Sequence, residues 1–171
     1  MPVALVTLGV YGFGEAAFFT ALHEARVDTF CDVRARRGVR GRGYAFANHR
    51  RLVARLTDAG IRYCHFRDLA PSRELRAEQR AADRFERRAK RNRDRLDPEF
   101  IARYQSECLA HLAAGEFLAR LGAEVRVVAL CCVERDPAAC HRSLLAVWLG
   151  RQLGCEPRHL QPPAHASESG S

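Results

Sequence analysis

Cysteine, histidine and arginine follow one another at Cys140, His141 and Arg142, shortly after a long apolar run. That run, residues 125–132, predicts a buried strand, and the apolar spacing after Cys140 predicts a helix. Helix N-termini attract anions and lower the pKa of thiols. These residue types therefore suit catalysis by a Cys140 thiolate beside His141, with Arg142 holding a negatively charged substrate. Glu134, between the two elements, is a candidate general base or orienting group.

Other interpretations of this segment stay open. Asp136 precedes Pro137 and also suits an N-cap position, in which case it already occupies the helix terminus. Cys140 would then be a small buried residue, or part of a binding site without covalent chemistry. Arg142 would in that case bridge to Asp32 or Glu134.

The cysteines also raise the question of a metal ion. Cys131 and Cys132 are adjacent in the predicted strand, so their side chains point to opposite faces and cannot easily bind one ion with Cys140 and His141. Glycines at residues 9–14 follow the first strand and resemble a dinucleotide-binding loop, but without its usual spacing. The sequence therefore predicts neither a metal site nor a cofactor.

A second group of candidate residues starts at Asp32, which ends a predicted strand, and continues through Arg34 and Arg36. Residues 33–57 contain no acid, whereas arginine and glycine are frequent there. Such a segment suits a phosphate group or a nucleic-acid backbone, and Tyr44 adds a ring that could stack on a base. The simpler interpretation is a solvated basic loop in which Arg34 pairs with Asp32 or another buried acid.

Apolar spacing predicts the elements that hold these groups. Strands are expected at residues 3–8, 29–33, 61–66, 125–132 and 158–160. Strands that alternate with helices indicate an α/β fold: a single three-layer domain over residues 1–161, with a mostly parallel sheet of about five strands. Ligands bind beyond the carboxyl ends of such strands. This rule selects the loops at 9–14, 34–46, 67–71 and 132–141.

Helices are expected at residues 15–25, at 48–60, from Asp97 onward and from Cys140 to Gly154. Asn48 and Asp97 suit N-cap positions, and the helix after Asp97 is expected to run through Leu112. In the last helix, Val147 is expected to face inward with its leucine neighbours.

Basic residues outnumber acidic ones in residues 72–95, a predicted helical insertion with few apolar side chains. The segment is interpreted as an exposed helix or a partly ordered arm, which could lie along nucleic acid. Its simpler interpretation is a solvated helix with Glu–Arg pairs. Residues 162–171 are expected to form a disordered tail.

The composition favours a soluble globular protein. Hydrophobic residues make up 47% of the 171 residues and charged residues 28%, which excludes a disordered or membrane chain. The formal net charge is +8, and all 28 basic residues except Lys90 are arginine. No transmembrane segment or signal peptide is recognised, so a cytoplasmic location and reduced cysteines are expected.

Several of these residues together resemble the bacterial domain of unknown function 488 family. Its signature is a strand followed by cysteine, glutamate, proline and Cys-His-Arg, matched here at Cys132 (or Cys131), Glu134, Pro137 and residues 140–142. Other matching positions are Asp32, Val33, Arg34, Arg36, Phe46, Asn48, Gly60, Tyr63 and His65. The resemblance covers roughly residues 3–160 and implies an α/β domain, but no reaction. The family's opening Thr-Ile-Gly-His-Ser is replaced here by Thr7-Leu8-Gly9-Val10-Tyr11.

The sequence thus favours an enzyme that acts on a phosphate-bearing small molecule or nucleic acid. The expected catalytic residues are Cys140, Glu134, His141 and Asp32, and the expected substrate-binding residues are Arg34, Arg36, Tyr44 and Arg142. The alternative is a non-catalytic nucleic-acid-binding module that uses the arginine-rich loop and helix. On the enzyme hypothesis, Arg142→Ala should abolish ligand binding and leave a cooperative fold.

Overall fold

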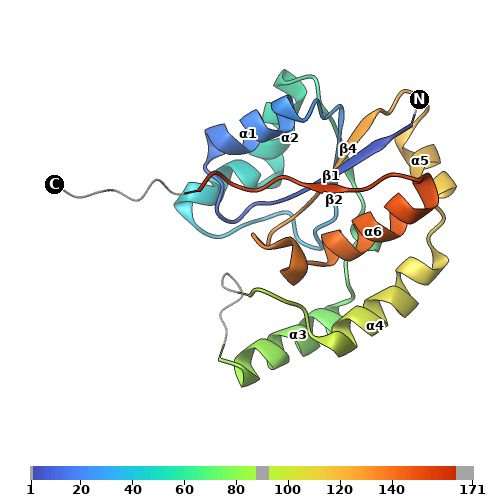
Figure 1. The fold of residues 1–171 in the computed structure, drawn as a ribbon. Coiled ribbons are helices and arrows are strands. Elements are labelled where there is room, and N and C mark those ends of the chain that lie inside the picture. Colours follow the sequence, from blue (N-terminus) through green and yellow to red (C-terminus); the bar gives the residue numbers. More distant parts are fainter. Residues whose placement is uncertain (1, 88–92, 165–171) are drawn as a thin grey trace.

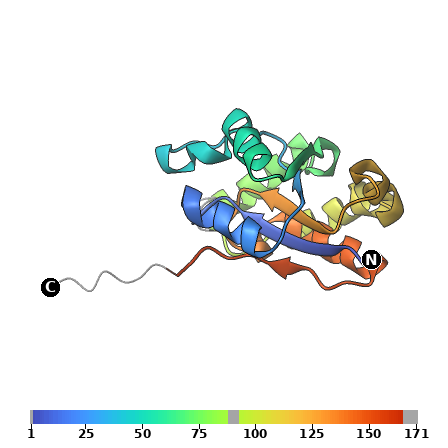
Figure 2. The same ribbon diagram turned by 90° about the horizontal axis from the view of Figure 1, so that it is seen from above.

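Five parallel strands form one sheet in the order β3-β2-β4-β1-β5 (Figures 1 and 2). The computed structural model describes residues 2–87 and 93–164. The strands are β1 (Ala4–Gly9), β2 (Thr29–Asp32), β3 (Arg62–His65), β4 (Val127–Cys132) and β5 (Arg158–His159). The structure confirms the expected α/β fold class and all five predicted strands, whose ends shift by one or two residues.

Helices cover both faces of this sheet (Figure 1). One face carries α1 (Glu15–Glu24) and α2 (His49–Asp58), and the other carries α5 (Ala114–Leu121) and α6 (His141–Leu153). Outside α6 lie α4 (Pro98–Glu107) and then α3 (Arg73–Phe85). The outer two of the three layers that the sequence predicts are α1 with α2 on one face and α5 with α6 on the other, and α3 and α4 add to the second of them from outside.

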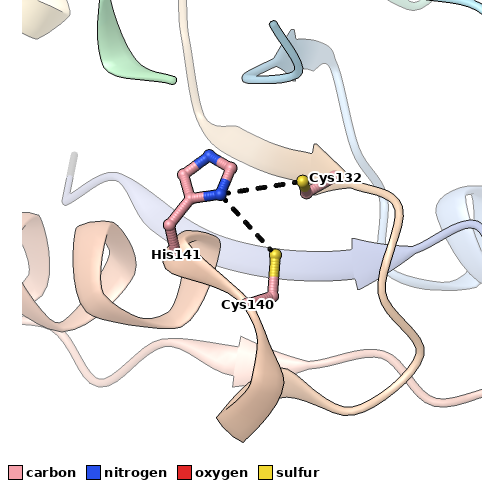
Figure 3. Close-up of side chains that lie close together, drawn as sticks. All are labelled: Cys132, Cys140 and His141. Carbon is pink, nitrogen blue, oxygen red and sulfur yellow. Dashed lines mark hydrogen bonds between the residues drawn. The ribbon is translucent and has the colours of Figure 1, made fainter. Parts of the chain in front are cut away.

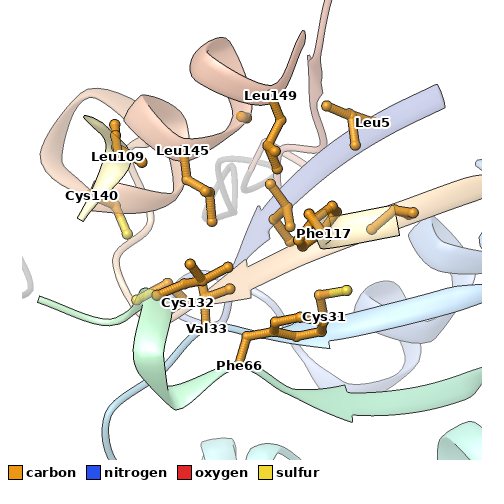
Figure 4. Close-up of a cluster of buried hydrophobic side chains, with 14 of the residues drawn as sticks. Leu5, Cys31, Val33, Phe66, Leu109, Phe117, Cys132, Cys140, Leu145 and Leu149 are labelled. Atoms are coloured by element: carbon orange, nitrogen blue, oxygen red, sulfur yellow. The ribbon is translucent and has the colours of Figure 1, made fainter. Parts of the chain in front are cut away.

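The central strands are apolar at consecutive positions because both of their faces are buried. Leu5 and Leu130 pack with Leu145 and Leu149 of α6 in one cluster (Figure 4). The intervening strand residues, such as Val6, Leu8 and Ala129, pack in a second cluster with Phe18, Leu22, Leu52 and Leu56 of α1 and α2. The alternation of the strand fixes which side chains reach which helix layer.

The carboxyl ends of three strands meet at one edge of the sheet. Asp32 lies opposite Cys131, and Gly9 lies opposite Cys132 in the strand register. The loops after β1, β2 and β4 therefore leave the sheet side by side. This edge is where parallel sheets place their ligands.

Of the predicted insertion at residues 72–95, residues 88–92 lie outside the described residues, and the described part differs from the exposed arm that its composition suggests. One face of α3 buries Leu75, Gln79 and Asp83 against the domain. Gln79 accepts a hydrogen bond from the backbone N–H of Asp97 at 3.0 Å and donates one to Asp83 at 3.0 Å. Asp83 in turn accepts from Arg93 Nε at 3.0 Å. A buried polar network, which apolar periodicity does not reveal, holds this helix in place.

The structure confirms some of the predicted helix details and contradicts others. Asp97 caps α4 as predicted and accepts from the N–H of Glu99, but α4 ends at Glu107 and does not continue through Leu112. Asn48 precedes α2, yet its side chain accepts from Val39 N at 2.8 Å and does not cap the helix. Val147 is 39% exposed, so its predicted inward orientation is wrong.

The end of the described chain lies against the domain. Pro162, the first residue of the expected tail, is buried, while residues 165–171 lie outside the described residues. Within residues 2–87 and 93–164, no helix combines the length and the apolar character that crossing a bilayer requires.

Candidate functional site

A cavity of about 320 Å³ opens at the carboxyl edge of the sheet. Its walls come from the loop after β2, from α3, from residues 93–100 and from the β4–α6 connection. Its charged lining is strongly unbalanced: among the described residues, Glu134 is the single acid that lines it, against six arginines. Those arginines are Arg34, Arg36, Arg40, Arg76, Arg80 and Arg93.

Cys132, Cys140 and His141 lie close together (Figure 3). All three are buried and also line this cavity. Cys132 ends β4, and Cys140 occupies the N-cap position of α6, which begins at His141. His141 Nδ1 lies 3.8 Å from Cys132 Sγ and 3.9 Å from Cys140 Sγ. Cys132 is not among the site residues that the sequence predicts. The sequence predicts no metal site, whereas the structure brings three possible metal ligands within 4.8 Å of one another.

Asp136 does not occupy the N-cap position of α6, because it caps a separate turn. Asp136 accepts a hydrogen bond from the N–H of Ala138 at 2.9 Å and caps the short 3₁₀ turn Pro137–Ala139. That turn ends before Cys140, which itself adopts the extended conformation of an N-cap residue. Cys140 is therefore at the positive end of the α6 dipole, as the sequence predicts.

The ring of His141 has a fixed orientation. Its Nε2 lies 3.1 Å from the carbonyl oxygen of Val33, which can only accept a hydrogen bond. The Nε2 atom must therefore carry the proton that it donates. In the neutral ring this leaves the lone pair of Nδ1 directed toward the two sulfur atoms.

The two thiols of the cluster have opposite pKa shifts. Burial opposes ionisation of Cys140, but a hydrogen bond from Cys132 and the charge of Arg142 outweigh it and hold its pKa well below the usual value. The hydrogen bond to Cys140, together with burial and the negative charges of Cys140 and Glu134, raises the pKa of Cys132. When one proton is shared between the two thiols, Cys140 is the residue that ionises.

Arg142 lies behind the cavity and is not one of its lining residues. Its Nη1 donates to the carbonyl of Glu134 at 2.6 Å, and its Nη2 donates to the carbonyl of Arg135 at 3.2 Å. Its Nε lies 3.4 Å from Thr7 Oγ1, and the residue is fully buried. Burial opposes the charge of this guanidinium, but the charges of Cys140 and Cys132 raise its pKa. This arrangement fixes the loop that carries Glu134.

Arg34 lines the cavity but is paired with Asp32. Its Nε and Nη2 donate to the two carboxylate oxygens of Asp32, each at 2.8 Å, and its Nη1 donates to the carbonyl of Ala47 at 2.9 Å. Asp32 is fully buried and also accepts from the Tyr63 hydroxyl at 2.8 Å. The pair is the simpler arrangement considered for this segment, and Asp32 does not reach the cavity.

The remaining predicted residues divide between the cavity and its surroundings. Arg36 and Glu134 line it, and Glu134 lies 3.6 Å from Arg93. Tyr44 is not a lining residue; its ring packs edge-on against Tyr11 at 5.2 Å, and its hydroxyl accepts from Gly12 N at 3.4 Å. Tyr11 lines the cavity in place of Tyr44, and Phe100 is a second aromatic lining residue.

Arginines of the insertion are the main residues that the sequence analysis missed. Arg76 and Arg80 are one helical turn apart on α3, and Arg93 follows the helix. The positions of Arg76 and Arg80 could in part be predicted, because Leu75 and Gln79 are one helical turn apart and mark the buried side of α3 next to them. The signal is weak because only Leu75 is apolar.

Gly9 has no room for a side chain where β1 passes the site. A Cβ atom there would lie 1.7 Å from the carbonyl oxygen of Glu134 and 3.1 Å from Arg142 Nη1. We expect Gly9→Ala to lower the free energy of unfolding by about 1–3 kcal/mol, because the Glu134 backbone must move away from Arg142. Urea denaturation measures the loss. Gly14→Ala is the control, since a Cβ at Gly14 has no neighbour within 4 Å, and equal stabilities of the two variants would contradict the close approach.

Comparison with known proteins identifies one family. Residues 15–149 of the 171-residue chain match the family model described as "Domain of unknown function DUF488". The match spans both the Asp32–Arg36 segment and the Cys-His-Arg segment. No curated protein and no solved structure matches the chain.

Proposed function

The chain belongs to the DUF488 family, and from this site we propose that it is an enzyme that acts on a phosphate-bearing substrate, a nucleotide or a nucleic-acid end. One observation carries the proposal: six arginines and a buried Cys132–Cys140–His141 cluster line the same cavity. Arginine forms strong charge-assisted hydrogen bonds with phosphate oxygens. The cluster supplies the reactive groups, and Glu134 is the nearby proton acceptor.

Arg76 is the residue best placed to bind the phosphate. Among the buried side-chain nitrogen and oxygen atoms of residues 2–87 and 93–164, the Nε of Arg76 is the one without a hydrogen-bond partner. Burial, together with the positive charges of Arg80, Arg36, Arg67 and Arg73, lowers the pKa of its guanidinium. A group of cations held together in this way favours an anion between them.

Arg34 and Arg142 support this site in a different way from Arg76. Their hydrogen bonds go to Asp32 and to backbone carbonyls, so we assign them the role of holding the loops after β2 and β4. The cavity volume of about 320 Å³ matches a small ligand. This size favours a nucleotide-like substrate over a module that binds along a nucleic-acid strand. We also propose a cytoplasmic location, where the seven free cysteines would remain reduced.

Removing Arg76 tests the anion site. We expect Arg76→Ala to weaken binding of a nucleoside monophosphate about 10- to 100-fold, since a hydrogen bond to a charged group contributes about 1.5–3 kcal/mol. Isothermal titration calorimetry with inorganic phosphate, a nucleoside monophosphate and a nucleoside diphosphate provides the measurement. Arg151→Ala, an exposed arginine of α6 outside the cavity, should bind like the unmodified chain. Equal affinities for both variants would contradict the assignment.

A test for turnover distinguishes an enzyme from a nucleic-acid-binding module. The phosphate compounds that bind are incubated with the protein and followed by ³¹P NMR, which detects any reaction that changes the phosphorus atom or its substituents. We expect a new resonance with the unmodified chain and none with Cys140→Ser. A chain that leaves every compound unchanged, but binds a single-stranded oligonucleotide with a steep salt dependence, would be the nucleic-acid-binding module instead.

A further inference from the structure

We propose that Cys132, Cys140 and His141 bind a single divalent zinc-type ion, whose fourth coordination position opens into the arginine-lined cavity. The inference deepens the proposed function, because it assigns the reactive centre of the same cavity. It rests on the proposed function only for the nature of the substrate. In this arrangement Cys140 is a metal ligand and not the nucleophile that the sequence suggests.

The distances within the cluster match a shared ion. All three candidate ligand atoms lie within 4.8 Å of one another, with Nδ1 at 3.8 Å and 3.9 Å from the two sulfur atoms. Tetrahedral zinc, with bonds of about 2.3 Å to sulfur and 2.0–2.1 Å to nitrogen, separates sulfur and nitrogen ligands by roughly 3.6 Å. The two nitrogen–sulfur distances would therefore change by only a few tenths of an ångström when an ion binds.

The surroundings orient the ligands for a metal. His141 presents Nδ1 to the sulfur atoms while its Nε2–H donates to the carbonyl of Val33. A ligating histidine in proteins almost always donates its other ring N–H to a carbonyl or carboxylate, which fixes the tautomer. The end of β4 positions Cys132 and the first turn of α6 positions the other two, so regular elements carry all three ligands.

Charge and access favour an ion of this class. Two thiolates would balance the charge of a divalent cation, and thiolate with imidazole is a donor set that selects zinc over magnesium or calcium. Any proton on the two sulfur atoms would leave when the ion binds. Three protein ligands leave one position for water or a substrate oxygen, as in catalytic zinc sites. All three residues line the same cavity as Arg76, so a phosphate group bound by Arg76 would share that cavity with the ion.

Metal titration of the untagged full-length chain tests the site directly. We expect the reduced, chelator-treated protein to bind one Co²⁺ per chain with thiolate-to-cobalt charge-transfer bands and tetrahedral visible bands, and Zn²⁺ to displace it. Cys132→Ser and Cys140→Ser should each weaken Zn²⁺ binding by at least about 100-fold. Cys155→Ser, beyond the opposite end of α6, should leave it unchanged. A spectrum without charge-transfer bands, or equal affinity in the Cys132 variant, would overturn the proposal.

Thiol protection in the unmodified chain covers the case in which a variant does not fold. Zn²⁺ should slow alkylation of Cys132 and Cys140, read peptide by peptide by mass spectrometry, and leave Cys155 unaffected. Equal rates with and without Zn²⁺ at the two cysteines would contradict the site.

The open position has its own readout. Inorganic phosphate added to the Co²⁺-loaded protein should change its visible spectrum, and an unchanged spectrum at saturating phosphate would exclude an open fourth position. Calorimetry on the metal-free protein measures anion binding separately. Zn²⁺ binding without affinity for any phosphate compound would therefore reject the proposed function alone, while the reverse result would reject the metal site alone.

Discussion

Asp32→Asn is expected to lower the free energy of unfolding by about 3–5 kcal/mol, because it leaves the buried guanidinium of Arg34 without its counter-charge. Both residues are almost fully buried, with side-chain exposures of 0% for Asp32 and 1% for Arg34. Burial opposes the charge on Arg34, and the hydrogen bond and charge of Asp32 outweigh it and raise its pKa. The amide of asparagine would also turn a donor toward one of the two guanidinium donors. Urea denaturation at neutral pH measures the loss.

Two controls separate the buried charge from ion pairing in general. Asp68→Asn removes an equally well-formed pair with Arg120, but the side chain of Asp68 is 59% exposed. The expected loss there is therefore at most about 1 kcal/mol. The double variant Asp32→Asn/Arg34→Met removes both charges and should be more stable than Asp32→Asn alone. If Asp32→Asn unfolds no more readily than Asp68→Asn, the pair does not stabilise the fold as its burial implies.

The architecture could be predicted from the sequence because each strand is a short apolar run between turn residues. In a parallel sheet, both faces are buried and the carboxyl ends share one edge. These two rules alone place the segments after Asp32 and Cys132 at the same edge of the sheet. They concern the backbone, and backbone patterning is the part of a fold that hydrophobic periodicity records directly.

The identity of the anion-binding side chains could not be predicted in the same way. The sequence places Arg34 at the end of a strand, but whether it faces a ligand or Asp32 depends on which partner the packed structure offers. Arg76 enters the cavity because α3 is held by Gln79 and Asp83, whose hydrogen bonds join residues 10 or more positions apart. Composition alone assigns such a segment to solvent, since buried polar networks have no apolar signature.

The Cys132–Cys140–His141 cluster could be predicted only in part from the sequence. Cys140 at the N-terminus of a helix could be predicted, because the strand and the following helix both have clear signals. The sequence also shows that Cys131 and Cys132 face opposite ways, but not which of them faces α6. That choice depends on the layer against which each face packs, and the structure assigns Cys132 to the α6 side and Cys131 to the α1–α2 side.

Arg142→Ala is expected to lower the free energy of unfolding by about 2–6 kcal/mol. The carbonyls of Glu134 and Arg135 would each lose a buried donor, at about 1–3 kcal/mol apiece. This expectation replaces the one based on sequence alone, in which the variant keeps its stability and loses its ligand. Urea denaturation gives the free energy, and hydrogen exchange over residues 133–136 reports whether the loop loosens.

Substitution by lysine separates the charge of Arg142 from its geometry. Arg142→Lys keeps a cation near Cys140 and Cys132, but an ammonium is a compact charge that lacks the planar, forked donors of arginine. We therefore expect Arg142→Lys to recover part of the stability lost in Arg142→Ala, with the loop still exchanging faster than in the unmodified chain. Arg151→Ala, an exposed residue of the same helix, should match the unmodified chain in both measurements. A stable Arg142→Ala variant that no longer binds a nucleoside monophosphate would show instead that this guanidinium contacts the ligand itself.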